Sequence, residues 1–240
     1  MNIARPRFVP DASSSHDEMK RLQRDIADTA VFSDGRDSPL DAEPRIAGVD
    51  QAFNGETAVS AVVVTRGEEV IERVHASAPV EIPYIPGLLS FREGSAILAA
   101  LQKLESEPDV LLVDGCGRIH FREAGLATHI GVTFDIPAIG VAKSLLCGNP
   151  TESVENLGEG TRVPIAADGT VSAPDGTVIG YAVQTRQYSS PIRSLNPVYV
   201  SPGNRVSAET AVDVVERAVN GYKLPEPVRQ ADRYAGDLTT

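Results

Sequence analysis

Two aspartates stand where apolar stretches of this sequence end or are interrupted. The run LLVDGCGRIH (residues 111–120) changes from apolar residues to Asp114, and Asp50 interrupts the apolar segment IAGVDQAF (residues 46–53). Burying a charged carboxylate is costly unless something neutralises it. An aspartate after a strand can also simply cap the turn that follows. Residue type alone leaves both interpretations open, a structural cap or a functional acid.

The chemistry that two such acids can perform depends on whether their side chains lie close together in the fold. Two carboxylates in one site repel each other, so one is protonated or a cation binds both. Hard carboxylate oxygens suit Mg²⁺ or Mn²⁺. A divalent ion held in this way lowers the pKa of a water, orients it, and stabilises charge on a phosphodiester during hydrolysis. Clustered acids would therefore predict a phosphodiester-cleaving site.

Hydrophobic spacing predicts the elements that carry these acids. A helix over residues 19–32 is followed by strands over 45–53, 56–66 and 69–80, then a helix over 87–104. A buried strand (109–113), a helix (124–132), a short strand (138–142), a β region ending near 200 and a closing helix (207–220) complete the order. Three antiparallel strands leading into parallel βαβ crossovers make a mixed sheet flanked by helices. We therefore expect an α/β, ribonuclease H-like fold, with a flexible N-terminal arm (1–16) and one domain (17–237).

This fold would bring the acids together. Its first strand lies beside the fourth, and neighbouring strands are about 4.8 Å apart, so Asp50 and Asp114 are expected to share one site. Glu93 lies in the first turns of the helix between those strands and can face the same cavity. The alternative remains that both aspartates are caps and that Glu93 is a solvated helix residue.

Composition places the chain among globular proteins. Its 240 residues are 42% hydrophobic, enough for a full core. No apolar run reaches the roughly eighteen residues that a membrane-spanning helix needs, and the N-terminus lacks an apolar signal core. Cys116 and Cys147 are expected to be free thiols. These features predict a cytoplasmic protein with no membrane partner.

The charge balance predicts how the thermal stability of the protein depends on salt. Net charge is −11, from 33 acidic and 22 basic residues, and only four of the basic residues are lysines. Acidic, lysine-poor surfaces are common in proteins from salt-rich cytoplasms, where many carboxylates keep the surface hydrated. The alternative is an ordinary acidic protein from a low-salt cytoplasm. We expect the melting temperature to rise from low to molar KCl in a thermal unfolding series. A melting temperature that does not rise with KCl would remove the idea.

Longer motifs carry a specific resemblance. PYIPGLLSFREG (83–94), VDGCGRIH (113–120), GLATHIGV (125–132), PAIGVAKSLLCG (137–148) and YVSPGNRVS (199–207) closely resemble endonuclease V, the nuclease family for deaminated nucleic acids. RIAGVDQAF (45–53) and LPEPVRQADRYAG (224–236) match its first strand and its C-terminal segment. The similarity covers about residues 19–236, almost the whole chain.

The resemblance implies a set of site residues. The family's metal-site acids fall on Asp50, Glu93 and Asp114, and its lysine near the scissile phosphate falls on Lys143. By itself, Lys143 could equally be a surface lysine after a strand. The family's wedge, which enters the duplex beside the lesion, falls on Tyr84, Ile85, Pro86 and Gly87. Without the match, that segment would be an ordinary proline turn.

The resemblance also implies the substrate and the reaction. The pocket for the altered base is expected near Gly115, Cys116, Gly117 and Ala142, with His120 on the substrate side or supporting it. Hypoxanthine pairs poorly, so opening the duplex costs least at the right target. The expected activity is Mg²⁺-dependent hydrolysis, with Mn²⁺ able to substitute, of the second phosphodiester 3′ to deoxyinosine. It would leave 3′-hydroxyl and 5′-phosphate ends in deaminated DNA and initiate repair. The sequence does not give the oligomeric state, and a monomer is favoured.

Two departures from the family pattern keep alternatives open. Cys116 stands where the family has histidine or glutamine. Asn204 stands where a late histidine contributes to the metal site, and its carbonyl oxygen could still bind Mg²⁺. One alternative function is an endoribonuclease specific for inosine in RNA. Another is a lesion-binding protein whose cleavage is weakened by Asn204. A generic metal phosphohydrolase would leave the predicted wedge without a role.

Overall fold

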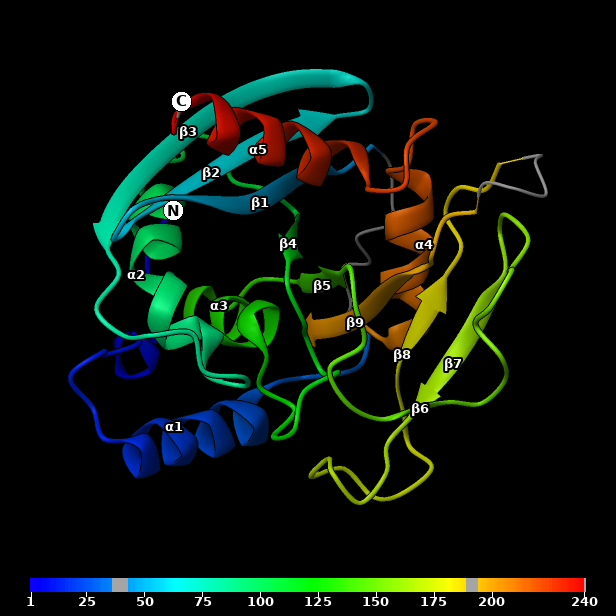
Figure 1. Cartoon of the computed structure of the whole chain (residues 1–240). Coiled ribbons are helices and arrows are strands. Elements are labelled where there is room, and N and C mark those ends of the chain that lie inside the picture. The colour runs from blue at the N-terminus through cyan, green and yellow to red at the C-terminus, as the bar shows by residue number, and fades with distance from the viewer. Residues whose placement is uncertain (36–42, 189–193, 240) are drawn as a thin grey trace.

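The computed structural model of the chain describes residues 1–35, 43–188 and 194–239. Within this part, nine strands form one mixed sheet in the order β3-β2-β1-β4-β5-β9-β8-β7-β6 (Figure 1). The strands are β1 (Arg45–Asn54), β2 (Thr57–Arg66), β3 (Glu69–Pro79), β4 (Val110–Asp114), β5 (Ala138–Ala142), β6 (Asn149–Pro150), β7 (Arg162–Ala166), β8 (Val178–Val183) and β9 (Val198–Asn204). β1, β4 and β5 are parallel to one another, and the other neighbouring strands pair antiparallel. The predicted α/β mixed sheet is confirmed.

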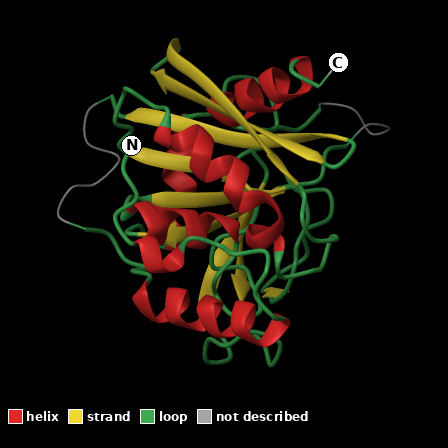
Figure 2. Ribbon diagram, turned by 90° about the vertical axis from the view of Figure 1, so that its left-hand side faces the viewer, coloured by secondary structure: helices red, strands yellow, loops and turns green. Residues whose placement is uncertain are grey.

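Helices cover both faces of the sheet (Figures 1 and 2). They are the short 3₁₀ helix η1 (Pro6–Phe8) and the α-helices α1 (His16–Thr29), α2 (Leu89–Gln102), α3 (Leu126–Phe134), α4 (Ala208–Arg217) and α5 (Glu226–Asp237). Alternation along β4 explains the two layers, because successive side chains of a strand point to opposite faces. Leu111 and Val113 pack in the cluster with α2 and α3, and Leu112 packs in the cluster with α4 and α5. None of these helices is long and apolar enough to cross a bilayer, as far as the described residues go.

Local sequence signals account for several boundaries. The two hairpins turn at Gly55 and Gly67, whose φ values of +58° and +57° favour glycine. Ser15 and Glu18 form a capping box at the start of α1. Ser207, the N-cap of α4, accepts a hydrogen bond from the backbone N–H of Thr210 at 3.1 Å.

The structure corrects two sequence predictions. Residues 1–16 are not a loose arm: the N-terminal ammonium donates to the carbonyls of Leu101 (3.2 Å) and Leu104 (3.0 Å), and Phe8 is buried. A positive charge is favourable there because the helix dipole places negative partial charge at the C-terminal end of α2. The helix over 207–220 is also not the last one. Helix α5 follows it and packs across β1 and β2.

Candidate active site

A cavity of about 390 Å³ lies at the carboxyl ends of the parallel strands β1, β4 and β5. The four predicted catalytic residues, Asp50, Glu93, Asp114 and Lys143, all line it. Strand register explains how residues so far apart in sequence meet. Val49 of β1 lies beside Val113 of β4, so the next residues of the two strands are Asp50 and Asp114. The three acids therefore line the same cavity, as the sequence predicts.

Asp50 carries an unsatisfied carboxylate oxygen. Its side chain is only 6% exposed, and Oδ1 accepts a hydrogen bond from the backbone N–H of Gln51 at 2.7 Å. Oδ2 is buried without a partner among the described residues. Burial, followed by the nearby charge of Asp114, raises the pKa of Asp50 to about 8. The hydrogen bond from Gln51 and the charge of Lys143 offset this cost only in part.

Glu93 brings the third acid from α2. It is the fifth residue of that helix and is 8% exposed. Burial raises its pKa to about 7; the charge of Asp114 adds to this effect and Arg92 opposes it. Near neutral pH this carboxyl group can therefore hold or release a proton.

Lys143 and Asp114 form an ion pair at the mouth of the cavity. Lys143 Nζ donates to Asp114 Oδ2 at 2.7 Å, and about half of the lysine side chain is exposed. Partial burial lowers the lysine pKa, but the charge and hydrogen bond of Asp114 outweigh this, so the pKa is raised overall. Lys143 is a fixed positive charge directly beside the acids.

The residues present fit a divalent cation. In residues 1–35, 43–188 and 194–239, no three His, Cys, Asp or Glu side chains stand as a ready-made metal cage. The buried Oδ2 of Asp50, which has no partner among these residues, and the raised pKa values of Asp50 and Glu93 are nevertheless features that a bound cation would relieve. Asp50 and Asp114 would hold such an ion, with Glu93 beside them, through the oxygen ligands that Mg²⁺ and Mn²⁺ prefer.

The predicted wedge forms a turn at the rim of the cavity. Tyr84 is 65% exposed and lines the cavity together with Gly87. Ile85 instead packs against Met19, Leu88 and Phe91, and neither it nor Pro86 is part of the lining. The turn thus presents an aromatic ring outward while an aliphatic side chain fixes it to the protein.

The predicted base-pocket residues are placed unequally. Gly115, Cys116 and Ala142 line the cavity. Gly117 does not: its N–H donates to Ser201 Oγ at 2.9 Å, and a Cβ there would overlap the carbonyl of Pro202. Glycine is needed at this position for close packing against β9. Burial raises the pKa of the Cys116 thiol to about 12, so the thiol stays neutral.

His120 lines the cavity but is tied into the protein. Only 3% of it is exposed, and its Nε2 lies 3.1 Å from the carbonyl oxygen of Gly87. Burial, together with the charge of Arg122, lowers its pKa to about 4. His120 is therefore neutral and, of the two predicted roles, fits the supporting one.

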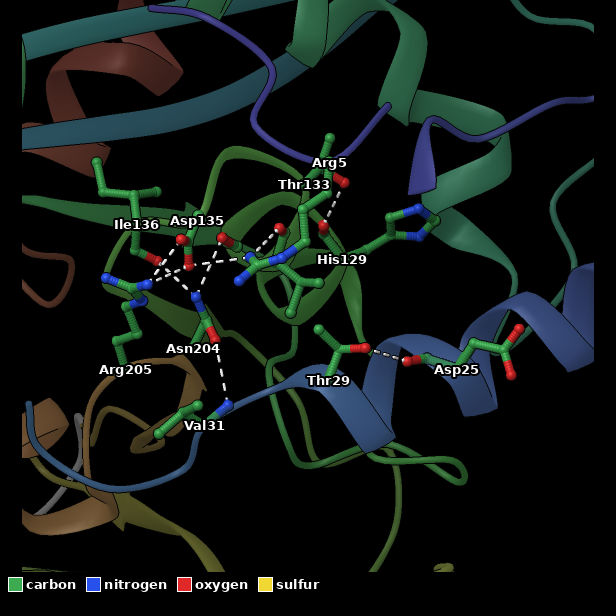
Figure 3. A network of polar contacts seen from close by, with 12 residues as sticks. Arg5, Asp25, Thr29, Val31, His129, Thr133, Asp135, Ile136, Asn204 and Arg205 are labelled. Carbon is green, nitrogen blue, oxygen red and sulfur yellow. Dashed lines mark hydrogen bonds and ion pairs between the residues drawn. The ribbon is translucent and has the colours of Figure 1, made fainter. Parts of the chain in front are cut away.

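The prediction that Asn204 contributes to the metal site is wrong. Strands β5 and β9 are antiparallel, and Asn204 lies beside Ala138, the first residue of β5, whereas Lys143 follows its last residue. Asn204 thus lies at the opposite end of these strands from the cavity. Its Nδ2 donates to the carbonyls of Gly131 and Ile136, both at 3.2 Å, and its Oδ1 accepts from Val31 N–H at 3.1 Å (Figure 3).

Replacing Asn204 by histidine should therefore change the stability of the fold and not the rate of cleavage. An imidazole cannot reproduce one acceptor and two donors in this buried place, and an unsatisfied buried polar group costs about 1–3 kcal/mol. We expect Asn204→His to lower the melting temperature and to leave cleavage per folded molecule little changed. A gain of cleavage in the variant would restore the view that Asn204 weakens the active site.

Gln51, Ser90 and Asp232 bear on the site but are not among the site residues predicted from the sequence. Gln51 and Ser90 line the cavity, and Gln51 Nε2 and Ser90 Oγ are buried without a partner in the described part of the chain. Asp232 on α5 does not line the cavity, but its charge adds a minor contribution to the raised pKa of Asp50, after burial and Asp114, and to that of Lys143, after Asp114 and Asp50. Gln51 directly follows Asp50, which was a usable signal. Asp232 could be placed only by knowing that residues 226–237 form a helix over β1.

A mixed sheet with acids at the ends of adjacent parallel strands, a paired lysine and an exposed aromatic turn is the architecture of a metal-dependent nuclease. Comparison with known proteins agrees. The family model of endonuclease V matches residues 29–233, and the chain belongs to the endonuclease V family. It is 60% identical to endonuclease V of Haloarcula marismortui, covering 97% of this chain and 96% of that one.

Solved structures show the same fold. Endonuclease V of Bacillus subtilis superposes with a TM-score of 0.82 at 31% identity, covering 99% of this chain and 97% of that one. Endonuclease V of Ciona intestinalis gives a TM-score of 0.76 at 28% identity, covering 92% and 96%. The Ciona structure is a complex with a 24mer DNA containing an inosine followed by a ribo-adenosine.

Proposed function

We propose that this protein is a Mg²⁺-dependent endonuclease, able to use Mn²⁺, that cleaves DNA at deoxyinosine and initiates repair. The cut falls at the second phosphodiester on the 3′ side and leaves 3′-hydroxyl and 5′-phosphate ends. The observation that carries this proposal is the meeting of Asp50, Glu93 and Asp114 in one cavity, where Asp50 Oδ2 is buried and has no partner in the part of the chain that the structure describes. The inosine-containing DNA bound by the Ciona relative supports the choice of substrate.

Each residue then has a role that its surroundings favour. Asp50 and Asp114 would hold the metal, which would supply a water of lowered pKa and positive charge beside the phosphate. Lys143, already 2.7 Å from Asp114, attracts and orients the scissile phosphate. Glu93, with its pKa raised to about 7, can accept a proton near neutral pH.

Recognition of the base rests on the other side of the cavity. Tyr84 enters the duplex beside the lesion and replaces the lost base stacking. The extruded base is read by the main chain around Gly115, Cys116 and Ala142, which lines the cavity. The neutral Cys116 thiol is a weak donor and adds little charge there.

A second candidate substrate is inosine in RNA. The oligonucleotide in the Ciona complex has a ribose directly after the inosine, so the fold accepts a 2′-hydroxyl there in that relative. The third possibility, a lesion-binding protein disabled by Asn204, loses its basis because Asn204 lies outside the cavity.

Matched oligonucleotides test the proposal. A labelled DNA duplex with one central deoxyinosine, the same duplex with adenine, and an RNA of equal sequence with inosine are incubated with Mg²⁺ or Mn²⁺. We expect a single cut in the deoxyinosine strand, mapped to the second phosphodiester on the 3′ side. Faster cleavage of the RNA would favour the second candidate, and no cleavage of any lesion substrate would refute both.

A further inference from the structure

One carbonyl oxygen in the wedge turn receives three hydrogen bonds. The acceptor is the oxygen of Gly87, directly after Pro86. The donors are Gln23 Nε2 at 2.8 Å, His120 Nε2 at 3.1 Å and Arg122 Nη2 at 3.2 Å. A single backbone carbonyl rarely gathers three side-chain donors, so this oxygen is an anchoring point.

The three donors are themselves held in place. Arg122 Nε donates to Gln23 Oε1 at 2.7 Å, so the glutamine amide is used at both ends. The backbone N–H of Arg122 donates to His120 Nδ1 at 3.2 Å, which leaves the ring hydrogen on Nε2, facing Gly87. Gln23 is fully buried, although α1 is otherwise a strongly amphipathic helix. Burying an amide is costly unless its hydrogen bonds are made, and here they are directed at the wedge turn.

The turn is fixed at both ends, and Pro83, Tyr84 and Pro86 between them are exposed. On the N-terminal side, Arg92 Nη1 donates to the carbonyl of Ile82 at 2.6 Å. On the C-terminal side, Gly87 has φ of +80°, and a Cβ there would lie 3.1 Å from the Phe121 ring. Between these anchors Tyr84 stays largely exposed. The geometry is that of a rigid support for a projecting ring.

We propose that Gln23 and Arg122 are positioning residues that brace the wedge turn against the base stack of a duplex. This rests on the proposed function, and it assigns to α1 a role outside the cleavage chemistry. Inserting a side chain between bases costs unstacking energy. If the turn moves when the side chain inserts, part of the stabilisation from its contacts with the bases is lost. In a single strand there is less stacking to displace. The brace should therefore matter mainly for lesions in duplex DNA.

Gln23→Met tests this, since methionine has a similar length but can neither donate to Gly87 nor accept from Arg122. The readout is the ratio of kcat/KM for the same deoxyinosine strand in duplex and in single-stranded form. Loss of two buried hydrogen bonds predicts a fall of this ratio by about tenfold. A second variant, Gln23→Glu, keeps the acceptor for Arg122 but has no donor for Gly87. It should change the ratio in the same direction if the methionine variant folds poorly.

The matched control is Ile26→Val, one turn along α1. Ile26 is fully buried and packs against Phe8, Ala124 and Val132, away from the turn, so it reports loss of packing alone. A 2-aminopurine next to the deoxyinosine gives a second signal, because its fluorescence rises on unstacking. We expect a smaller rise with the Gln23 variants than with Ile26→Val.

The outcomes separate the two proposals. A lower duplex-to-single-strand ratio and reduced unstacking in the Gln23 variants, but not in Ile26→Val, support the brace. Equal losses on both substrates, or an unchanged ratio, overturn it while leaving the nuclease assignment intact. If the parent protein cuts neither substrate with Mg²⁺ or Mn²⁺, the proposed function itself fails.

Discussion

Asp50→Asn is expected to lower kcat about a thousandfold, the scale seen when a preorganised electrostatic contact at a reacting centre is lost. The same change should leave the metal-free protein at least as stable as its parent. Both effects have one cause. Asp50 Oδ2 is buried without a partner among residues 1–35, 43–188 and 194–239, and the pKa of the group is raised to about 8. The charged carboxylate is therefore unfavourable until a cation binds it. Asparagine fills the same space without a charge.

The measurements are single-turnover cleavage of the deoxyinosine duplex and thermal unfolding without metal at pH 8. Asp175→Asn is the matched control, because Asp175 is an exposed residue in the loop before β8 and should change neither quantity. Asp114→Asn should also lose activity, but it breaks the ion pair with Lys143, so its stability is harder to interpret. Full activity in Asp50→Asn would show that the acids are structural.

This expected opposition between activity and stability is typical of active sites, where groups are kept in unfavourable surroundings because the reaction needs them. Three unpartnered buried polar atoms of the described residues, Asp50 Oδ2, Gln51 Nε2 and Ser90 Oγ, belong to residues that line the same cavity. Their concentration here marks a surface prepared for a charged ligand.

Much of the sheet could be predicted from sequence because its signals are local. Alternating and continuous apolar runs locate the strands, and glycines at positive φ mark the hairpins. The meeting of Asp50 and Asp114 then follows from strand order alone, since each acid comes one residue after the paired Val49 and Val113. Glu93 follows from its place near the start of the connecting helix.

The errors arose where long-range contacts decide. The N-terminal segment has polar composition, yet the ammonium of Met1 finds the end of α2, about a hundred residues away. Asn204 was assigned by motif, but its role depends on the direction of β9, which runs antiparallel to β5. The brace on Gly87 joins α1 to a loop after β4, and no periodicity within either segment indicates that contact.

The metal-free protein should lose stability as pH rises from about 6.5 to 8, and metal should restore it. Asp50 and Glu93 have ordinary pKa values of 3.8 and 4.5, raised in the fold to about 8 and 7. At pH values below the ordinary pKa values, the contribution of these two groups to the free energy of unfolding is fully present. It is lost as pH rises through the pKa values of the folded state, because the folded state binds more protons than the unfolded state. His120 and His129 act oppositely: burial lowers each pKa from 6.5 to about 4, so their contribution grows up to pH 6.5.

Below pH 6.5 the loss of stability from the two carboxyl groups and the gain from the two histidines offset each other. The melting temperature should therefore fall above pH 6.5. Melting temperatures between pH 6.5 and 8.5 measure it, and Asp50→Asn should flatten the slope. Metal must displace the protons, so Mg²⁺ should raise the melting temperature more at pH 8.5 than at 6.5, and calorimetry in two buffers should detect proton release. An equal slope in the parent and in Asp50→Asn, or a Mg²⁺ effect independent of pH, would mean that these carboxyl groups do not form the metal site.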